Sequence, residues 1–102
     1  MTLWSLSGDR APHGVAVAKM RIQPCPPAPL ATLGVNPGRE WFTVLTGTAR
    51  LQLGERTIEI AEGDAAEFST MTPHAIGCDD EPVEVLTILD RDGERAHLHP
   101  EH

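Results

Sequence analysis

Basic residues are scarce in this chain of 102 residues, which carries 8 Lys and Arg against 15 Asp and Glu and a formal charge of −7. Nucleic acids and anionic lipids are bound through cationic surfaces, so we expect neither nucleic acid nor a membrane as a direct partner. The sequence also lacks an apolar run close to the ~20 residues of a membrane span, and its N-terminus lacks the pattern of a secretory signal. These absences predict a cytoplasmic protein.

Cysteine and tyrosine are equally sparse, with two Cys and no Tyr. Cys25 and Cys78 could pair in principle, but without an export signal we expect both to stay reduced. No Ser, His and Asp order suggests a catalytic triad, and Cys78 is expected to be a small buried side chain rather than a nucleophile. The length allows one domain and excludes a repeat array.

No window of the sequence shows the 3.6-residue apolar period of a helix, whereas several show the two-residue period of a strand. The even positions between Gly14 and Ile22 are apolar, which predicts a strand, and 24–29 holds four prolines, which predicts an extended connector outside any sheet. Alternation in 49–53 and 57–60 around Gly54 predicts a hairpin. The almost continuously apolar run 83–89 predicts a strand buried on both faces.

Turn signals recur about every 8–12 residues, which is typical of a small sandwich or barrel. A further strand is expected at 96–99, and any helix should be limited to a turn or two. Four glycines are expected at turns where φ can be positive, namely Gly47, Gly54, Gly63 and Gly93. Trp41 and Phe42 must point to opposite faces, so one is expected in the core and the other at an interface or the barrel mouth.

Two spaced motifs resemble those of the cupin superfamily. In the first, a glutamate and a glycine are separated by six residues, as are Glu40 and Gly47. The second has glycine and aspartate near its start and proline and histidine near its end. Here it is represented by Gly63, Asp64, Phe68, Pro73 and His74, with Cys78 where the family has asparagine.

The resemblance implies an all-β fold, a double-stranded β-helix or jelly-roll barrel of antiparallel strands with little helix. It implies one domain over residues 1–102, in which 1–33 supplies N-terminal strands and the Pro-rich connector and 34–99 the barrel motifs. Over roughly 34–99 the chain is most similar to the cupin sensor half of helix-turn-helix regulators, and we expect no DNA-binding half.

The family typically holds a divalent metal ion with two histidines, the motif glutamate and the later histidine. The two histidine positions are occupied here by Gly34 and Asn36, which leaves Glu40 and His74. Because catalytic sites usually need three protein ligands, we expect either no cofactor or one weakly held divalent ion. His97 and His99 would share one strand face and could ligate jointly, although a solvated tail is the simpler interpretation.

The resemblance also places Glu40 and His74 on the inner wall of the barrel. There they could hydrogen-bond to each other, or Glu40 could pair instead with Arg39 or Arg50. The wall of a ligand pocket is expected to consist of apolar side chains, namely Met20, Leu45, Leu51, Phe68, Ile76 and Leu86, with Asn36 at its rim.

The favoured function is a non-enzymatic module that binds a small organic ligand in the barrel. The alternative is a metal-dependent enzyme of the isomerase, decarboxylase or dioxygenase type that uses Glu40 and His74. Small cupins commonly dimerise by exchanging or pairing N-terminal strands, so a homodimer formed through 14–22 is expected.

Overall fold

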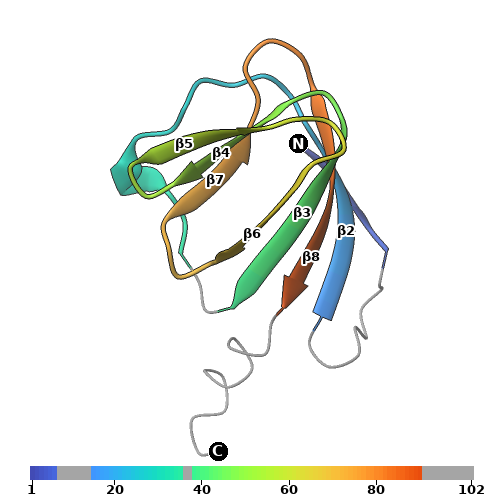
Figure 1. Ribbon diagram of the computed structural model, residues 1–102, viewed down its shortest axis with the longest axis horizontal. Helices are drawn as coiled ribbons and strands as arrows, with labels where there is room; N and C mark the ends of the chain where they lie inside the picture. The colour runs from blue at the N-terminus through green and yellow to red at the C-terminus, as the bar shows by residue number, and fades with distance from the viewer. Residues whose placement is uncertain (7–14, 36–37, 91–102) are drawn as a thin grey trace, which may run out of the picture.

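Two antiparallel β-sheets face each other in the computed structural model, which describes residues 1–6, 15–35 and 38–90 (Figure 1). In the five-stranded sheet the order is β1 (Thr2–Ser5), β2 (Val15–Ile22), β8 (Val83–Asp90), β3 (Arg39–Thr46) and β6 (Ala65–Ser69). In the three-stranded sheet it is β5 (Arg56–Ile60), β4 (Ala49–Leu53) and β7 (His74–Gly77). The only helical segment in the described ranges is the 3-10 turn η2 (Leu30–Thr32). The all-β prediction is confirmed.

The core lies between the inner faces of the two sheets. It consists of buried apolar side chains from six strands and the segment after β7: Ile22, Phe42, Val44, Ala49, Leu51, Ile60, Phe68, Cys78, Val83 and Val85. The T-shaped contact of Phe42 and Phe68, with ring centroids 6.4 Å apart, joins β3 to β6. Phe42 is therefore the core member of the Trp41–Phe42 pair, because neighbouring strand residues point to opposite faces.

Several local predictions are confirmed by the strands and turns. β2 covers the predicted strand, and β4 and β5 form the predicted hairpin around Gly54, which has φ +57°. Gly47 turns the chain from β3 into β4 with φ +86°, and a Cβ there would lie 2.9 Å from the Pro82 carbonyl oxygen. A side chain at position 47 is thus disfavoured by both conformation and space.

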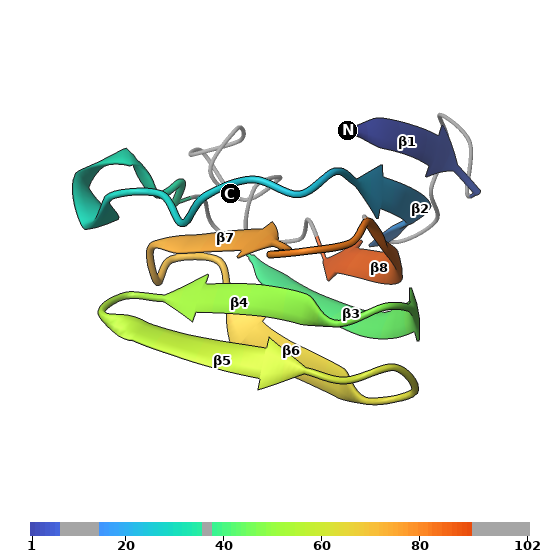
Figure 2. The same ribbon diagram turned by 90° about the horizontal axis from the view of Figure 1, so that it is seen from above.

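The Pro-rich connector leaves β2 and runs alongside β7 (Figure 2), where the outward-facing Gln52 of β4 reaches it. The Gln52 amide on β4 donates to the Ala28 carbonyl at 2.8 Å and accepts from the Ala28 N–H at 3.1 Å. The Cys25 N–H donates to the Cys78 carbonyl at 3.1 Å. The prolines keep this segment out of either sheet, as predicted, and it serves as a cover.

One strand differs from its prediction. β8 buries Val83, Val85 and Thr87, but the alternating residues Leu86 and Ile88 are only half-buried. The expectation of burial on both faces is wrong, because the described residues supply a cover for the three-stranded sheet and not for this one. Gly93 and the strand expected at 96–99 lie outside the described residues.

Within the described residues, no helix has the length and apolar character needed to cross a membrane.

Candidate functional site

Glu40 begins the inward-facing row of β3. It alternates with Trp41 and shares its face with buried Phe42 and Val44, so its carboxylate points toward the interior at one end of the sheet. The Thr87 hydroxyl on neighbouring β8 donates to Glu40 Oε2 at 2.7 Å. A half-buried carboxylate needs such a donor, and Thr87 supplies it from inside the barrel.

His74 begins β7 on the opposing sheet. Its backbone N–H donates to the Gly34 carbonyl at 3.1 Å, and its Nδ1 lies 2.9 Å from the Thr72 carbonyl oxygen. Since a carbonyl oxygen can only accept, Nδ1 carries the proton in this contact. In the neutral ring Nε2 is then a hydrogen-bond acceptor, and the contact also fixes the ring orientation.

The Phe68 ring connects these two polar side chains. Phe68 is the ladder partner of Glu40 across β3 and β6, and its ring centroid lies 5.2 Å from that of His74. The structure therefore brings Glu40, Phe68 and His74 together, with Thr87 behind the carboxylate. The arrangement presents two acceptors, a carboxylate and an imidazole nitrogen, beside an aromatic wall.

The other expected pocket residues divide into three groups. Leu51 is in the core, and Met20 and Ile76 pack against it. Leu45 is 40% exposed, and Leu86 lies on the outer face between the inward-facing Val85 and Thr87. The structure thus keeps Leu45 and Leu86 away from the interior, while Asn36 lies outside the described residues.

The alternative partners considered for Glu40 are engaged elsewhere. Arg39 Nη2 lies 3.5 Å from Glu67 Oε1 on the outer side of the sheet. Arg50 pairs with Asp79 at the far end of the barrel. Strand alternation explains the first pairing, because Arg39 and Glu40 are neighbours and must face opposite ways.

Among the described residues, the side chains do not complete a cupin-type metal centre. Across 1–6, 15–35 and 38–90, no group of three or more His, Cys, Asp or Glu side chains is arranged to hold an ion. Gly34 offers no side-chain ligand, so Glu40 and His74 form an incomplete set for a structural or catalytic site. His97 and His99 lie outside the described residues.

Thr87 is the site residue that the sequence analysis missed. It supplies the only hydroxyl in 83–89, a stretch that is apolar apart from Thr87 and Glu84. It lies an even number of positions from Val83 and Val85, whose side chains point inward. A polar residue at an inward position needs a hydrogen-bond partner, which was the available signal. Its identification required the β3–β8 register, in which Thr87 is the ladder partner of Phe42, two residues from Glu40 on the same face of β3.

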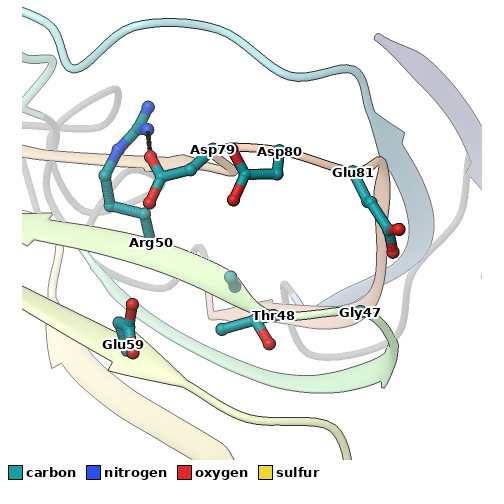
Figure 3. A pocket seen from close by; sticks show the side chains of 8 residues that line it. Gly47, Thr48, Arg50, Glu59, Asp79, Asp80 and Glu81 are labelled. Atoms are coloured by element: carbon teal, nitrogen blue, oxygen red, sulfur yellow. Dashed lines mark hydrogen bonds and ion pairs between the residues drawn. The ribbon is translucent and has the colours of Figure 1, made fainter.

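A concave region lies at the other end of β3, around Gly47 (Figure 3). It encloses about 370 Å³ and is lined largely by polar residues: Gly47, Thr48, Ala49, Arg50, Glu59, Asp79, Asp80 and Glu81. Figure 3 shows Arg50 and Asp79 pointing toward each other, and Arg50 Nη1 also donates to the Cys78 carbonyl at 3.3 Å. The Arg50 guanidinium therefore binds the segment of the chain that follows β7.

Both cysteines are free thiols, Cys25 exposed and Cys78 buried. Burial raises the pKa of the Cys78 thiol, which donates to the Ile22 carbonyl at 3.3 Å. A neutral, hydrogen-bonded thiol in the core is not a nucleophile. This agrees with the structural role expected for Cys78.

Comparison with known proteins identifies the fold. A family model described as a cupin domain matches residues 26–89. No curated protein sequence matches the chain significantly.

Several solved structures are similar to the chain at low sequence identity. The cupin domain of an XRE-family transcriptional regulator from Enterobacter cloacae has a TM-score of 0.73 at 12% identity, over 86% of this chain and 93% of that one. A cupin 2 domain-containing protein from Halorhodospira halophila has 0.73 at 22% identity, over 89% and 64%. The DMSP lyase DddQ from Ruegeria pomeroyi has 0.71 at 20%, over 87% and 46%. The chain spans less than two thirds of the last two proteins.

Proposed function

The chain belongs to the cupin family, and on this premise we propose that it is a non-enzymatic module that binds a small organic ligand at the Glu40 end of the barrel. The observation that carries the proposal is the hydrogen bond from Thr87 to Glu40 beside the Phe68 and His74 rings. Ligand sites are commonly apolar walls with a few fixed polar groups, and this end of the barrel has that composition.

The fixed polar groups favour a ligand that carries hydrogen-bond donors. The Glu40 carboxylate can accept more bonds than the one from Thr87, and His74 offers Nε2 as an acceptor. The Phe68 face suits an apolar or aromatic body. A small molecule with hydroxyl or amine groups on such a body is the expected class.

Binding can be tested by thermal shift and calorimetry on the untagged full chain, with a panel of small hydroxylated and amine-bearing compounds. A ligand at 100 times its Kd stabilises the folded state by about 2.7 kcal/mol. Glu40→Gln should weaken binding at least tenfold. Glu67→Gln on the outer side of the sheet is the control and should leave binding unchanged. The proposal fails if no compound stabilises the protein, or if Glu40→Gln and His74→Ala both bind as the wild type does.

The metal-dependent enzyme remains the alternative, and the same preparation discriminates between the two functions. Stoichiometric iron, manganese, nickel or zinc in untagged protein, lost in His74→Ala, would establish a metal centre. Less than about a tenth of an equivalent would leave such an enzyme without its ion. The ligand-binding proposal expects this second result.

A further inference from the structure

The buried guanidinium of Arg50 has good acceptors at one of its nitrogens and poor ones at the other two. Nη1 donates to the Cys78 carbonyl at 3.3 Å and pairs with Asp79 (Figure 3). Nη2 donates to the Cys25 thiol at 3.7 Å, and within the described part of the chain the buried Nε has no hydrogen-bond partner. The side chain is only 6% exposed, so bulk water is a poor substitute for an acceptor at Nε. A buried charged donor without an acceptor lowers stability.

Nε and Nη2 form one edge of the planar guanidinium. Such an edge donates two parallel hydrogen bonds to an anion that carries two oxygens. The thiol of Cys25 is a weak acceptor and offers one atom to this edge. A separation of 3.7 Å leaves room for an oxygen attached to the sulfur to lie about 2.8 Å from a guanidinium nitrogen, the usual length of a charged hydrogen bond.

The place where the thiol meets the guanidinium is open in two respects. Cys25 is exposed, so a small solute can reach its sulfur. Gly77 is the ladder partner of Arg50 across β4 and β7, and a Cβ there would lie 2.5 Å from Nη2 and 3.4 Å from Cys25 Sγ. The missing side chain at position 77 therefore leaves the space that both groups share.

The second cysteine points elsewhere. The Cys78 thiol is buried and donates to the Ile22 carbonyl at 3.3 Å. The Cys25 thiol lies against Arg50, whose side chain is on the outer face of the three-stranded sheet. The two thiols are directed to different sides of the chain, so oxidation is expected to add oxygen to Cys25 rather than to join the cysteines.

We propose that Cys25 is a modification site at which a hydroperoxide oxidises the thiol, and that Arg50 binds the oxygenated sulfur. In the first step the sulfur attacks one peroxide oxygen, so that an S–O bond forms and the O–O bond breaks. The sulfur loses two electrons, and the leaving oxygen takes the thiol proton, which yields a sulfenic acid and water or an alcohol. A second hydroperoxide converts the sulfenic acid to a sulfinic acid in the same way. Its ionised form has the two anionic oxygens that the Nε–Nη2 edge lacks.

Oxidation at this position strengthens the attachment of the connector. Cys25 belongs to the connector, and its backbone N–H already donates to the Cys78 carbonyl at 3.1 Å. Charged hydrogen bonds from Arg50 to the oxidised side chain add to this single backbone bond. The modification therefore couples the stability of the connector to the peroxide level around the protein.

A substitution that imitates the sulfinate tests the binding by Arg50. Cys25→Asp places two anionic oxygens one carbon from the backbone, and Cys25→Asn is the uncharged reference of the same shape. Urea unfolding should give Cys25→Asp a folding equilibrium constant about tenfold above that of Cys25→Asn. The same Asp and Asn pair at exposed Gln23 should differ less than about twofold.

The advantage of Asp over Asn at position 25 should vanish in an Arg50→Met background, because the two side chains would then no longer interact. If Arg50→Met does not fold, Arg50→Lys keeps the charge without the planar fork and should remove most of the advantage.

Peroxide treatment of the folded, untagged full chain tests the chemistry. A 1,3-diketone probe should trap a sulfenic acid at Cys25, and peptide mass spectrometry should later find two added oxygens there and none at Cys78. Exposed Met71 reports the peroxide dose in every sample. Cys25→Ser treated in the same way is the reference for stability, and oxidised wild type should unfold at a higher urea concentration than this variant.

Four results would overturn the proposal. The first is a Cys25 that stays unmodified while Met71 is oxidised, and the second is a disulfide between Cys25 and Cys78. The third is a Cys25→Asp variant no more stable than Cys25→Asn. The fourth is an advantage of Asp over Asn that persists in full without the guanidinium of Arg50.

Discussion

The outward-facing side chains of the two sheets combine polarity and burial in opposite ways. On the three-stranded sheet they include Arg50 and Gln52, which are polar and yet only 5% and 9% exposed. On the five-stranded sheet they include Trp41, Leu86 and Ile88, which are apolar and only half-buried. The polar positions are covered by the connector, and the apolar positions have no such cover among the described residues.

The difference shows that strand alternation fixes which side chains share a face, but not which face is covered. Gln52 bonds to the backbone of the connector, and Arg50 Nη2 donates to the Cys25 Sγ of the connector at 3.7 Å, so the polarity of both side chains holds the cover in place. Among the described residues, the apolar outward-facing side chains Trp41, Leu86 and Ile88 contact no such covering segment.

The largest effect is expected from removing Arg50, one of the two outward-facing polar side chains that the connector covers. Arg50→Ala should lower the free energy of unfolding by about 2–4 kcal/mol, because it empties buried volume and leaves the Cys78 carbonyl without this donor. Asp79 is half-exposed, so the ion pair itself contributes little of that loss. Urea unfolding monitored by circular dichroism measures the change.

Arg39→Ala is the matched control on the five-stranded sheet. Its pair with Glu67 is exposed on both sides, so the loss should be at most about 1 kcal/mol. Arg50→Met should cost less than Arg50→Ala, because it keeps the stem volume and removes a buried Nε that has no hydrogen-bond partner. Equal losses of unfolding free energy in Arg39→Ala and Arg50→Ala would contradict the expected difference between the two sheets.

A smaller effect is expected at the other polar contact with the connector. Gln52→Ala removes both bonds to Ala28 and should cost about 1–2 kcal/mol. Hydrogen exchange at the Ala28 amide should accelerate more than exchange in the β4–β5 ladder. Gln23→Ala, at an exposed position where the connector starts, should change neither quantity. Unchanged exchange at Ala28 in Gln52→Ala would show that the connector is held by other contacts.

The smallest effect concerns the buried thiol beneath the connector. Burial raises the folded-state pKa of Cys78 above its ordinary value of 9.0, so the neutral thiol stabilises the fold below that pH. This contribution is lost as the pH rises above 9.0, because the unfolded thiol ionises first. Urea unfolding between neutral and alkaline pH should therefore show a decline that Cys78→Ala lacks and Cys25→Ala retains. Identical pH slopes in all three proteins would show that Cys78 does not cause the decline.

Much of the fold could be predicted because its signals are local. Period-two alternation located the β4–β5 hairpin, and four prolines marked the connector. The two motifs gave the barrel, and they also placed Glu40 on its inner wall. Thr87 was missed because its contact with Glu40 joins residues 47 apart in the sequence, which only the strand register brings together.

The sequence by itself determined the strands, their turns and the family, since each depends on short-range alternation, on glycine and proline conformation or on a fixed motif spacing. The tertiary structure decided which faces are covered. It removed Leu45 and Leu86 from the expected pocket and buried Arg50 and Gln52 beneath the connector. The physical reason is that burial depends on packing between segments far apart in the chain, which alternation within one strand does not specify.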